Sequence, residues 1–245
     1  MTSLEWLIPD WPAPANVRAM VSTRRGGVSV GPYDSLNLGD HVGDLPQAVA
    51  ENRRRFAEAA GLARAPRWLQ QVHGCGVVSD EAEAGSAADA CWTAKADVPC
   101  AVLTADCLPV LFADLEGGCV AAAHAGWRGL AAGVLEATIA QMPVPPRRLI
   151  AWLGPAIGPK AFQVGDEVRA AFVGQAAEDA AAFAPDGQRW RADLFALARG
   201  RLGRCGVGAV YGGDICTVSD AGRFFSHRRD GLSGRFASLI QRAKK

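Results

Sequence analysis

The chain has 245 residues, of which 49% are apolar and 21% charged, and its formal net charge is +1. A chain of this length can bury a large core, and its apolar content excludes a disordered or collagen-like protein. The near-zero charge argues against a nucleic-acid-binding protein, because a surface that follows phosphates shows as a clear excess of Lys and Arg.

The N-terminal residues and the cysteines predict a cytoplasmic protein. Residues 1–7 contain no basic stretch followed by an apolar one, so no secretory signal is expected. No apolar run reaches the roughly 18 residues that a membrane-spanning helix needs. Seven cysteines at irregular spacing, without a CxxC pair, predict reduced thiols. We expect no membrane partner, and the sequence does not predict the oligomeric state.

The first hundred residues predict a strand, a helix and two short strands. The helix begins after Asp44 and Leu45 with an early Pro46 and ends at Gly61, which is the usual order of these residue types at helix ends. An Ala-, Gly- and Ser-rich stretch predicts a loop. The predicted strands are 16–23, 68–72 and 76–78, the helix runs to residue 60, and the loop is 82–90.

The rest of the chain predicts apolar strands alternating with helices. Three strands, 101–104, 110–113 and 119–124, precede a helix at 130–141 and a strand at 149–153. Three more helices are predicted at 165–173, 193–203 and 233–245. Continuous apolar strands between helices predict an α/β fold whose sheet is covered on at least one face.

Three side chains with metal-binding chemistry stand where predicted strands give way to loops: His73, Cys107 and His124. Two imidazoles and a thiolate suit zinc, and three protein ligands leave a fourth position open, as catalytic zinc requires. Because the three are 34 and 17 residues apart, they form no local signature. Two buried histidines and a core cysteine therefore remain an alternative, as does a metal-free site in which Cys107 is the nucleophile, a histidine the base and Asp106 the orienting residue.

A candidate anion site follows His124 directly. Gly126 opens a turn into a predicted helix, where free backbone N–H groups and the Arg128 guanidinium could bind an oxyanion. Arg24 lies in a similar basic, Gly-rich loop, and residues 225–230 form a third basic cluster. Lone Gly-rich motifs are weak signals, so solvated turns with surface arginines are the alternative.

Ordered motifs along the chain resemble one bacterial family, first named polyphenol oxidase or laccase-domain proteins and now described as purine nucleoside phosphorylases. The motifs are STRRGGVS at 22–29, SLNLG at 35–39, HVGD at 41–44, QVHG at 71–74, TADCLPV at 104–110, HAGWRG at 124–129, LGPAIGP at 153–159, and RRD at 228–230 with GR at 234–235. The resemblance extends over about residues 22–240.

The resemblance implies a single α/β (α+β) domain, 1–245, built as a layered sandwich of mixed β-sheets flanked by helices. It implies zinc on His73, Cys107 and His124. From the residues themselves, the catalytic candidates are Cys107, Asp106 and His124, with Asp106 as the candidate for proton transfer because it lies beside Cys107. The expected partners are purine nucleosides and phosphate, the latter held by Arg128, Arg24 and Gly126. The expected reactions are phosphorolysis of adenosine, inosine and methylthioadenosine to base and ribose 1-phosphate, and deamination of adenosine.

Two features limit what the resemblance carries over. Four histidines without a His-x-His pair cannot supply a multicopper oxidase, so copper oxidation is rejected as the primary activity. The family commonly has Tyr where this chain has His227. Members are also linked to editing of peptidoglycan precursor peptides, so a Cys-dependent amide hydrolase is the rival enzyme. A non-catalytic protein that binds zinc or a nucleotide is a third alternative.

Overall fold

A mixed six-stranded sheet forms the centre of the computed structural model, which describes residues 4–79 and 83–244. Its strands, in spatial order, are β12 (Ala209–Gly212), β8 (Leu149–Leu153), β6 (Leu108–Asp114), β7 (Val120–Ala125), β4 (Ala90–Thr93) and β3 (Val77–Val78). The outer pairs β12–β8 and β3–β4 are parallel and the inner pairs are antiparallel. In the β6–β7 pair Pro109 lies opposite His124, so the turn before β6 is beside the end of β7.

The remaining strands form two smaller sheets. A four-stranded sheet contains β1 (Trp6–Leu7), β2 (Val17–Ser22), β13 (Phe236–Arg242) and β5 (Cys100–Thr104) in that order. A three-stranded sheet contains β10 (Phe183–Asp186), β11 (Arg189–Ala192) and β9 (Gln163–Val164). The helices are α1 (Pro46–Ala59), α2 (Trp127–Ala132), α3 (Val134–Gln141), α4 (Asp166–Val173), α5 (Leu194–Arg204) and α6 (His227–Asp230).

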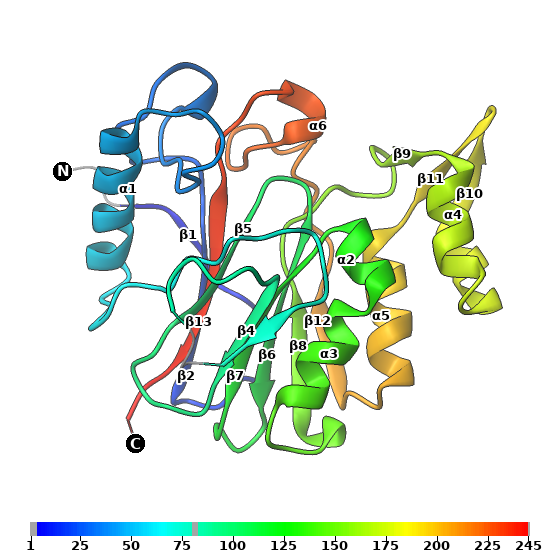
Figure 1. Ribbon diagram of the computed structural model, residues 1–245, viewed down its shortest axis with the longest axis horizontal. Coiled ribbons are helices and arrows are strands. Elements are labelled where there is room, and N and C mark those ends of the chain that lie inside the picture. Colours follow the sequence, from blue (N-terminus) through cyan, green and yellow to red (C-terminus); the bar gives the residue numbers. More distant parts are fainter. Residues whose placement is uncertain (1–3, 80–82, 245) are drawn as a thin grey trace.

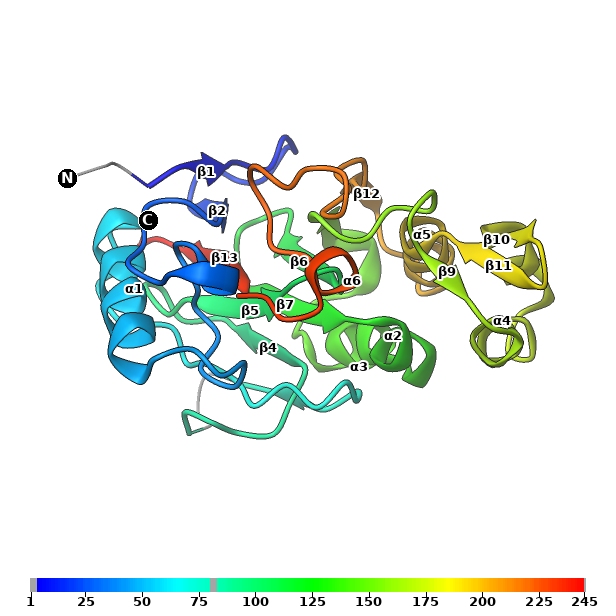
Figure 2. The same cartoon turned by 90° about the horizontal axis from the view of Figure 1, so that it is seen from above.

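These elements stack in four layers (Figures 1 and 2). Helix α1 covers the outer face of the four-stranded sheet, the two larger sheets face each other, and α2, α3 and α5 cover the far face of the six-stranded sheet. The three-stranded sheet and α4 lie together at one end of the molecule. The expected layered sandwich of mixed sheets flanked by helices, in one compact domain, is therefore confirmed.

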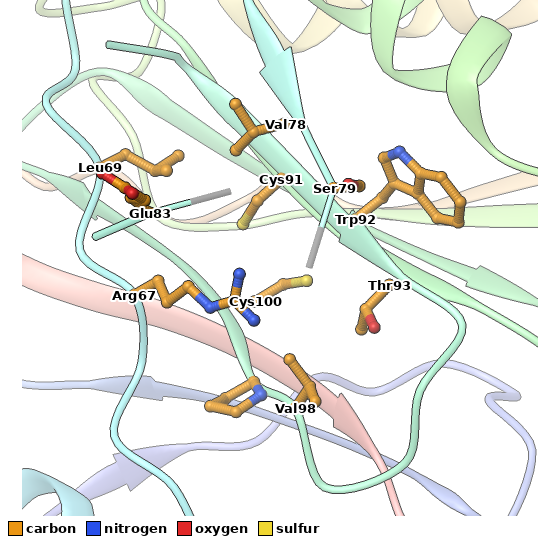
Figure 3. Close-up of a pocket in the computed structure, with 11 residues that line it drawn as sticks. Arg67, Leu69, Val78, Ser79, Glu83, Cys91, Trp92, Thr93, Val98 and Cys100 are labelled. Atoms are coloured by element: carbon orange, nitrogen blue, oxygen red, sulfur yellow. The ribbon is translucent and has the colours of Figure 1, made fainter. Parts of the chain in front are cut away.

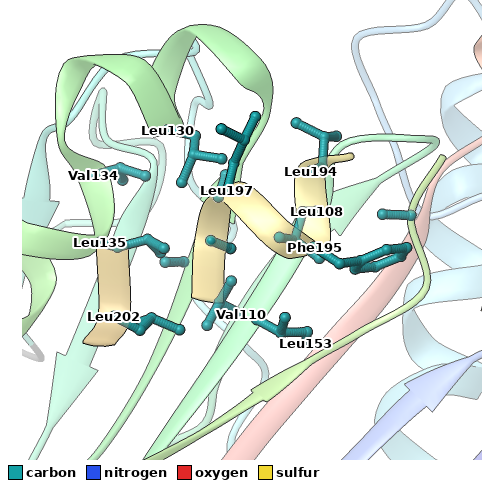
Figure 4. Close-up of a cluster of buried hydrophobic side chains, with 14 of the residues drawn as sticks. Leu108, Val110, Leu130, Val134, Leu135, Leu153, Leu194, Phe195, Leu197 and Leu202 are labelled. Carbon is teal, nitrogen blue, oxygen red and sulfur yellow. The ribbon is translucent and has the colours of Figure 1, made fainter. Parts of the chain in front are cut away.

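The side-chain alternation of the strands explains the layers. On β6, Val110 and Phe112 pack under the helices, whereas Leu111 and Ala113 enter the core between the sheets. A strand whose two faces are both buried is expected to be apolar along its length. All seven residues of β6 are buried; the first six are apolar, and the last, Asp114, is paired with Arg148. Figure 4 shows Leu108 and Val110 of β6 meeting leucines of α3 and α5 in the largest core.

Most predicted elements are present with small shifts at their ends, but three predictions are wrong. The segment predicted as a helix at 233–245 contains strand β13, which pairs with both β2 and β5 and buries side chains on both faces. The helix predicted at 130–141 is two helices, because Gly133 has a φ of 93° and breaks it. No strand forms at 68–72, where only Gln70 makes an isolated bridge.

Strand β4 was not predicted, since it begins inside the expected loop 82–90. Position 82 of that loop and position 245 of the predicted last helix lie outside the described residues. Within the part of the chain that the structure describes, no helix combines the length and the apolar character needed to cross a membrane.

Phe112→Ala should destabilise the fold strongly, because the ring is fully buried on the central strand β6 and its removal leaves a cavity. We expect the free energy of unfolding to fall by about 3–5 kcal/mol, measured by urea denaturation. The matched control is Leu115→Ala at the end of the same hairpin, where the side chain is exposed. Equal effects for the two variants would contradict this account of the core.

Candidate metal centre and substrate pocket

The structure brings His73, Cys107 and His124 together, although they come from three separate parts of the chain. One ligand atom from each lies within 4.8 Å of the others, and among the described residues they form the one such group. The His73 and His124 rings meet edge to face with centroids 4.8 Å apart. Cys107 Sγ lies 3.9 Å from His73 Nε2. The donor set predicted from the sequence is therefore a real cluster in space.

The buried carboxylate of Asp89 holds this cluster in position. His124 Nδ1–H donates to Asp89 Oδ1 at 2.8 Å, which leaves Nε2 of the same ring free to bind a cation. The backbone N–H groups of His73 and Gly74 donate to the two oxygens of the same carboxylate at 2.9 and 2.7 Å. The N–H of Val72 also donates to it. These bonds fix the loop that carries His73.

Charge at the cluster favours a thiolate. Burial raises the pKa of the Cys107 thiol, but the facing His124 and His73 imidazoles outweigh burial and bring this pKa to about 6. Burial lowers the pKa of His124, but Cys107 and Asp89 outweigh it and bring that pKa to about 9. Thiolate is the form in which cysteine binds a metal, and a bound cation would take the place of the proton on His124.

The backbone at the cluster is unusual at two of the site residues. His73 and Asp106 have φ values of 60° and 85°, in the left-handed region that few residues other than glycine adopt. Gly126, which precedes α2, leaves room for the cluster. A Cβ at that position would lie 2.8 Å from Cys107 Sγ and 3.3 Å from the His73 ring.

Asp106 was predicted as a catalytic residue, and its carboxylate is occupied by three donors. Thr217 Oγ1 donates to one oxygen at 2.6 Å. Ser226 Oγ and the backbone N–H of Arg228 donate to the other oxygen at 3.0 and 2.6 Å. The carboxylate thus ties the residue before Cys107 to the start of α6.

A cavity of about 350 Å³ opens over the cluster and is lined by His73, Ala105, Asp106, Cys107, Trp127, Arg128, Ile157, Phe162, Leu194, His227 and Arg228. Arg128 lies over the Trp127 ring at 4.4 Å and Arg228 over the Phe162 ring at 5.4 Å. The pocket therefore combines two cations, an aromatic and aliphatic wall, and the metal-binding cluster. This composition suits a small ligand that carries both a flat ring and an anion.

Arg24 lies elsewhere. It lines a different hollow together with Arg25, and its Nε donates to the Asp34 carbonyl at 2.8 Å. Sequence reasoning placed Arg228 in a basic cluster that could contribute to an anion site, and it missed Asp89 entirely. The one sequence signal for Asp89 is an isolated carboxylate in an Ala-rich stretch directly before an apolar strand.

Asp89→Asn should weaken metal binding about 10- to 100-fold, because an amide keeps the shape but loses the charge that orients His124. Zinc competition against a chromophoric chelator measures this. Glu116→Gln is the control, since Glu116 is an exposed side chain in the turn at the far end of β6. Unchanged zinc affinity in a folded Asp89→Asn protein would show that this carboxylate does not support the centre.

Comparison with known proteins identifies the family of this chain. Residues 18–243 match the family described as multi-copper polyphenol oxidoreductase laccase. The chain is 59% identical over 237 residues to purine nucleoside phosphorylase PA4543 of Pseudomonas aeruginosa (96% of this chain, 97% of the relative). It is 52% identical over 236 residues to purine nucleoside phosphorylase YfiH of Escherichia coli (96% and 97%).

Solved structures give the same result. The crystal structure of Neisseria meningitidis protein NMB0706 has a TM-score of 0.94 at 54% identity, covering 98% of this chain and 99% of that one. YlmD from Geobacillus stearothermophilus has a TM-score of 0.91 at 33% identity, covering 100% and 98%. The chain therefore belongs to the laccase-like polyphenol oxidoreductase family.

Proposed function

We propose that this protein is a zinc-dependent purine nucleoside phosphorylase that also deaminates adenosine and works in the cytoplasm. Relatives that carry the name purine nucleoside phosphorylase are 59% and 52% identical over nearly the whole chain. The observation that carries the proposal is the pocket itself, in which the His73–Cys107 edge of the cluster faces Arg128 and Arg228. Adenosine, inosine and methylthioadenosine are the proposed nucleosides.

The donor set fits zinc. Two histidines and one thiolate, with His124 oriented by a carboxylate, are typical of a catalytic zinc centre with an open position toward the pocket. A zinc ion held there would supply a Lewis acid beside the substrate. The four histidines of the whole sequence are too few for the several copper ions in the family's name.

In this proposal, different pocket residues bind the nucleoside and the phosphate. Trp127, Phe162 and Ile157 offer apolar surface to a purine ring, while Arg128 and Arg228 offer charged donors to phosphate. In phosphorolysis a phosphate oxygen forms a bond to the anomeric carbon of ribose as the bond to the base breaks. Holding phosphate and nucleoside in one pocket turns that encounter into a reaction within a complex.

Two predicted site residues receive different roles in this proposal. Because three donors already occupy the Asp106 carboxylate, we assign Asp106 to positioning the Cys107 turn and α6 rather than to proton transfer. Arg24 is left out of the phosphate site, because its guanidinium is bound to backbone carbonyls in another hollow.

Base release from adenosine, inosine and methylthioadenosine should require phosphate and should be lost with the metal. We expect about one zinc per chain, and loss of zinc and turnover together on chelation. Cys107→Ala and His124→Ala should lose both as well. Chromatography of the free bases with parallel metal analysis measures this, and Cys75→Ala is the thiol control because Cys75 is exposed and lies outside the cluster. Full turnover in metal-free protein would refute the zinc-dependent mechanism.

Arg128→Ala should raise the KM for phosphate about tenfold or more, since a charge-assisted hydrogen bond contributes about 1.5–3 kcal/mol. The KM for the nucleoside should change less. Initial rates at varied phosphate give both constants. Arg189→Ala is the matched control, an exposed arginine at the β10–β11 hairpin. If both variants bind phosphate like the parent, Arg128 has no part in the phosphate site.

One arrangement favours a second candidate, an amide hydrolase that edits peptidoglycan precursor peptides. Cys107, His124 and Asp89 stand in the order nucleophile, base and orienting carboxylate. Hydrolysis that survives chelation but not iodoacetamide would support it. A protein that binds zinc and nucleoside without turnover would instead be a binding partner.

A further inference from the structure

A second pair of cysteines lies between the two larger sheets, away from the metal-binding cluster. Cys91 belongs to β4 of the six-stranded sheet and Cys100 to the first position of β5 in the four-stranded sheet. Both belong to the same inter-sheet core, and both line one small cavity (Figure 3). They are thiols in the structure, with exposed fractions of only 9% and 3%.

The size of this cavity limits what can reach the two sulfur atoms. Its volume is about 20 Å³, which is enough for about one water-sized molecule. Leu69, Val78 and Trp92 contribute apolar wall, and Arg67 contributes a guanidinium beside the sulfurs. Hydrogen peroxide, with two heavy atoms, is an oxidant close to this size, whereas a peptide disulfide such as oxidised glutathione is far too large to enter.

The surroundings favour a reactive sulfur at Cys91. A hydrogen bond with the Cys100 side chain lowers the pKa of the Cys91 thiol, and it outweighs the opposing effect of burial. Backbone N–H groups of Ala101 and Ala122 and the charge of Arg67 act in the same direction. By contrast, burial raises the pKa of Cys119 to about 11. Burial alone therefore does not make a core thiol of this protein reactive.

We propose that Cys91 and Cys100 are a peroxide-oxidised dithiol, which closes to a disulfide between β4 and β5. The Cys91 thiolate attacks one peroxide oxygen, so that an S–O bond forms, the O–O bond breaks and hydroxide leaves as water after taking a proton. The Cys100 sulfur then attacks Cys91, the S–S bond forms, and the sulfenic oxygen leaves as a second water with the Cys100 proton. The two thiols lose two electrons and one peroxide gains them.

The proposed disulfide would lie close to the residues that support the metal-binding cluster. Cys91 follows Asp89 by two residues, and it lies opposite Ala122, two residues before His124 on β7. A disulfide would fasten the strand that starts beside Asp89 to the neighbouring sheet. The inference does not depend on which substrate the pocket binds.

The test is to treat the zinc-loaded protein with hydrogen peroxide, quench, unfold, alkylate the remaining thiols and map the tryptic peptides. Cleavage after Arg67, Lys95 and Arg128 separates peptide 68–95, which holds Cys75 and Cys91, from peptide 96–128, which holds Cys100, Cys107 and Cys119. We expect the two peptides to become linked, with fragmentation placing the bond between Cys91 and Cys100, and to separate on reduction.

Variants and a larger oxidant make the result decisive. Cys91→Ser and Cys100→Ser should each abolish the link, while Cys75→Ser should keep it, because Cys75 is an exposed thiol in the same peptide as Cys91. Oxidised glutathione added to the folded protein should leave Cys91 unmodified, so that Cys91 is alkylated after unfolding. The proposal is overturned if peroxide leaves Cys91 and Cys100 both alkylatable in the wild type, or if glutathione modifies Cys91 before unfolding. It is also overturned if the link runs through Cys75, Cys107 or Cys119. The wild-type map decides the question even if a serine variant fails to fold.

Discussion

The candidate site depends above all on one buried carboxylate. Asp89 accepts the His124 ring N–H and the backbone N–H groups of the loop that carries His73, and the His124 backbone N–H in turn donates to the Asp89 carbonyl at 2.7 Å. Burial raises the pKa of Asp89, but the bond from His124 and the backbone donors outweigh it and keep this pKa below its usual range. One negative charge thus orients one ligand, places a second and favours a cation nearby.

Asp106 is a second buried carboxylate that holds neighbouring segments together, on the other side of the Cys107 turn. Its carboxylate holds Thr217, Ser226 and the start of α6, so the segment that supplies Arg228 is fixed relative to Cys107. Both carboxylates accept several hydrogen bonds, and neither is exposed. Hydrogen bonds of this kind hold the site residues in one arrangement, as the positioning of two reactants in the proposed reaction would require.

Sequence reasoning was most successful where the physical signal was local. Strand β8 and helix α1 were predicted almost to the residue. A short apolar run specifies β8, and an early Pro46 with Gly61 after the last turn specifies α1. Strand β13 was mistaken for a helix, since its identity comes from pairing with β2 and β5 on both sides, which are about 135–220 residues distant along the chain. The residue types of the metal-binding cluster were visible, whereas their meeting point depends on the β6–β7 register and on Asp89.

The chemistry of the donors argues against oxidation by copper, despite the family's name. Two histidines and a cysteine also serve in electron-transfer copper sites, but those sites add a distant axial ligand such as methionine. Met20 lies in the core under α1, and Met142 lies in the core beneath the other helices, so neither of these methionines is near the cluster. Of the remaining histidines, His227 lines the pocket rim and His41 lies in a loop beside Asp40. These two histidines are too few to bind the further copper ions that oxygen reduction needs. A single Lewis-acid ion held beside two arginines would suit the proposed transfer of phosphate and nucleoside groups, and not the transfer of electrons.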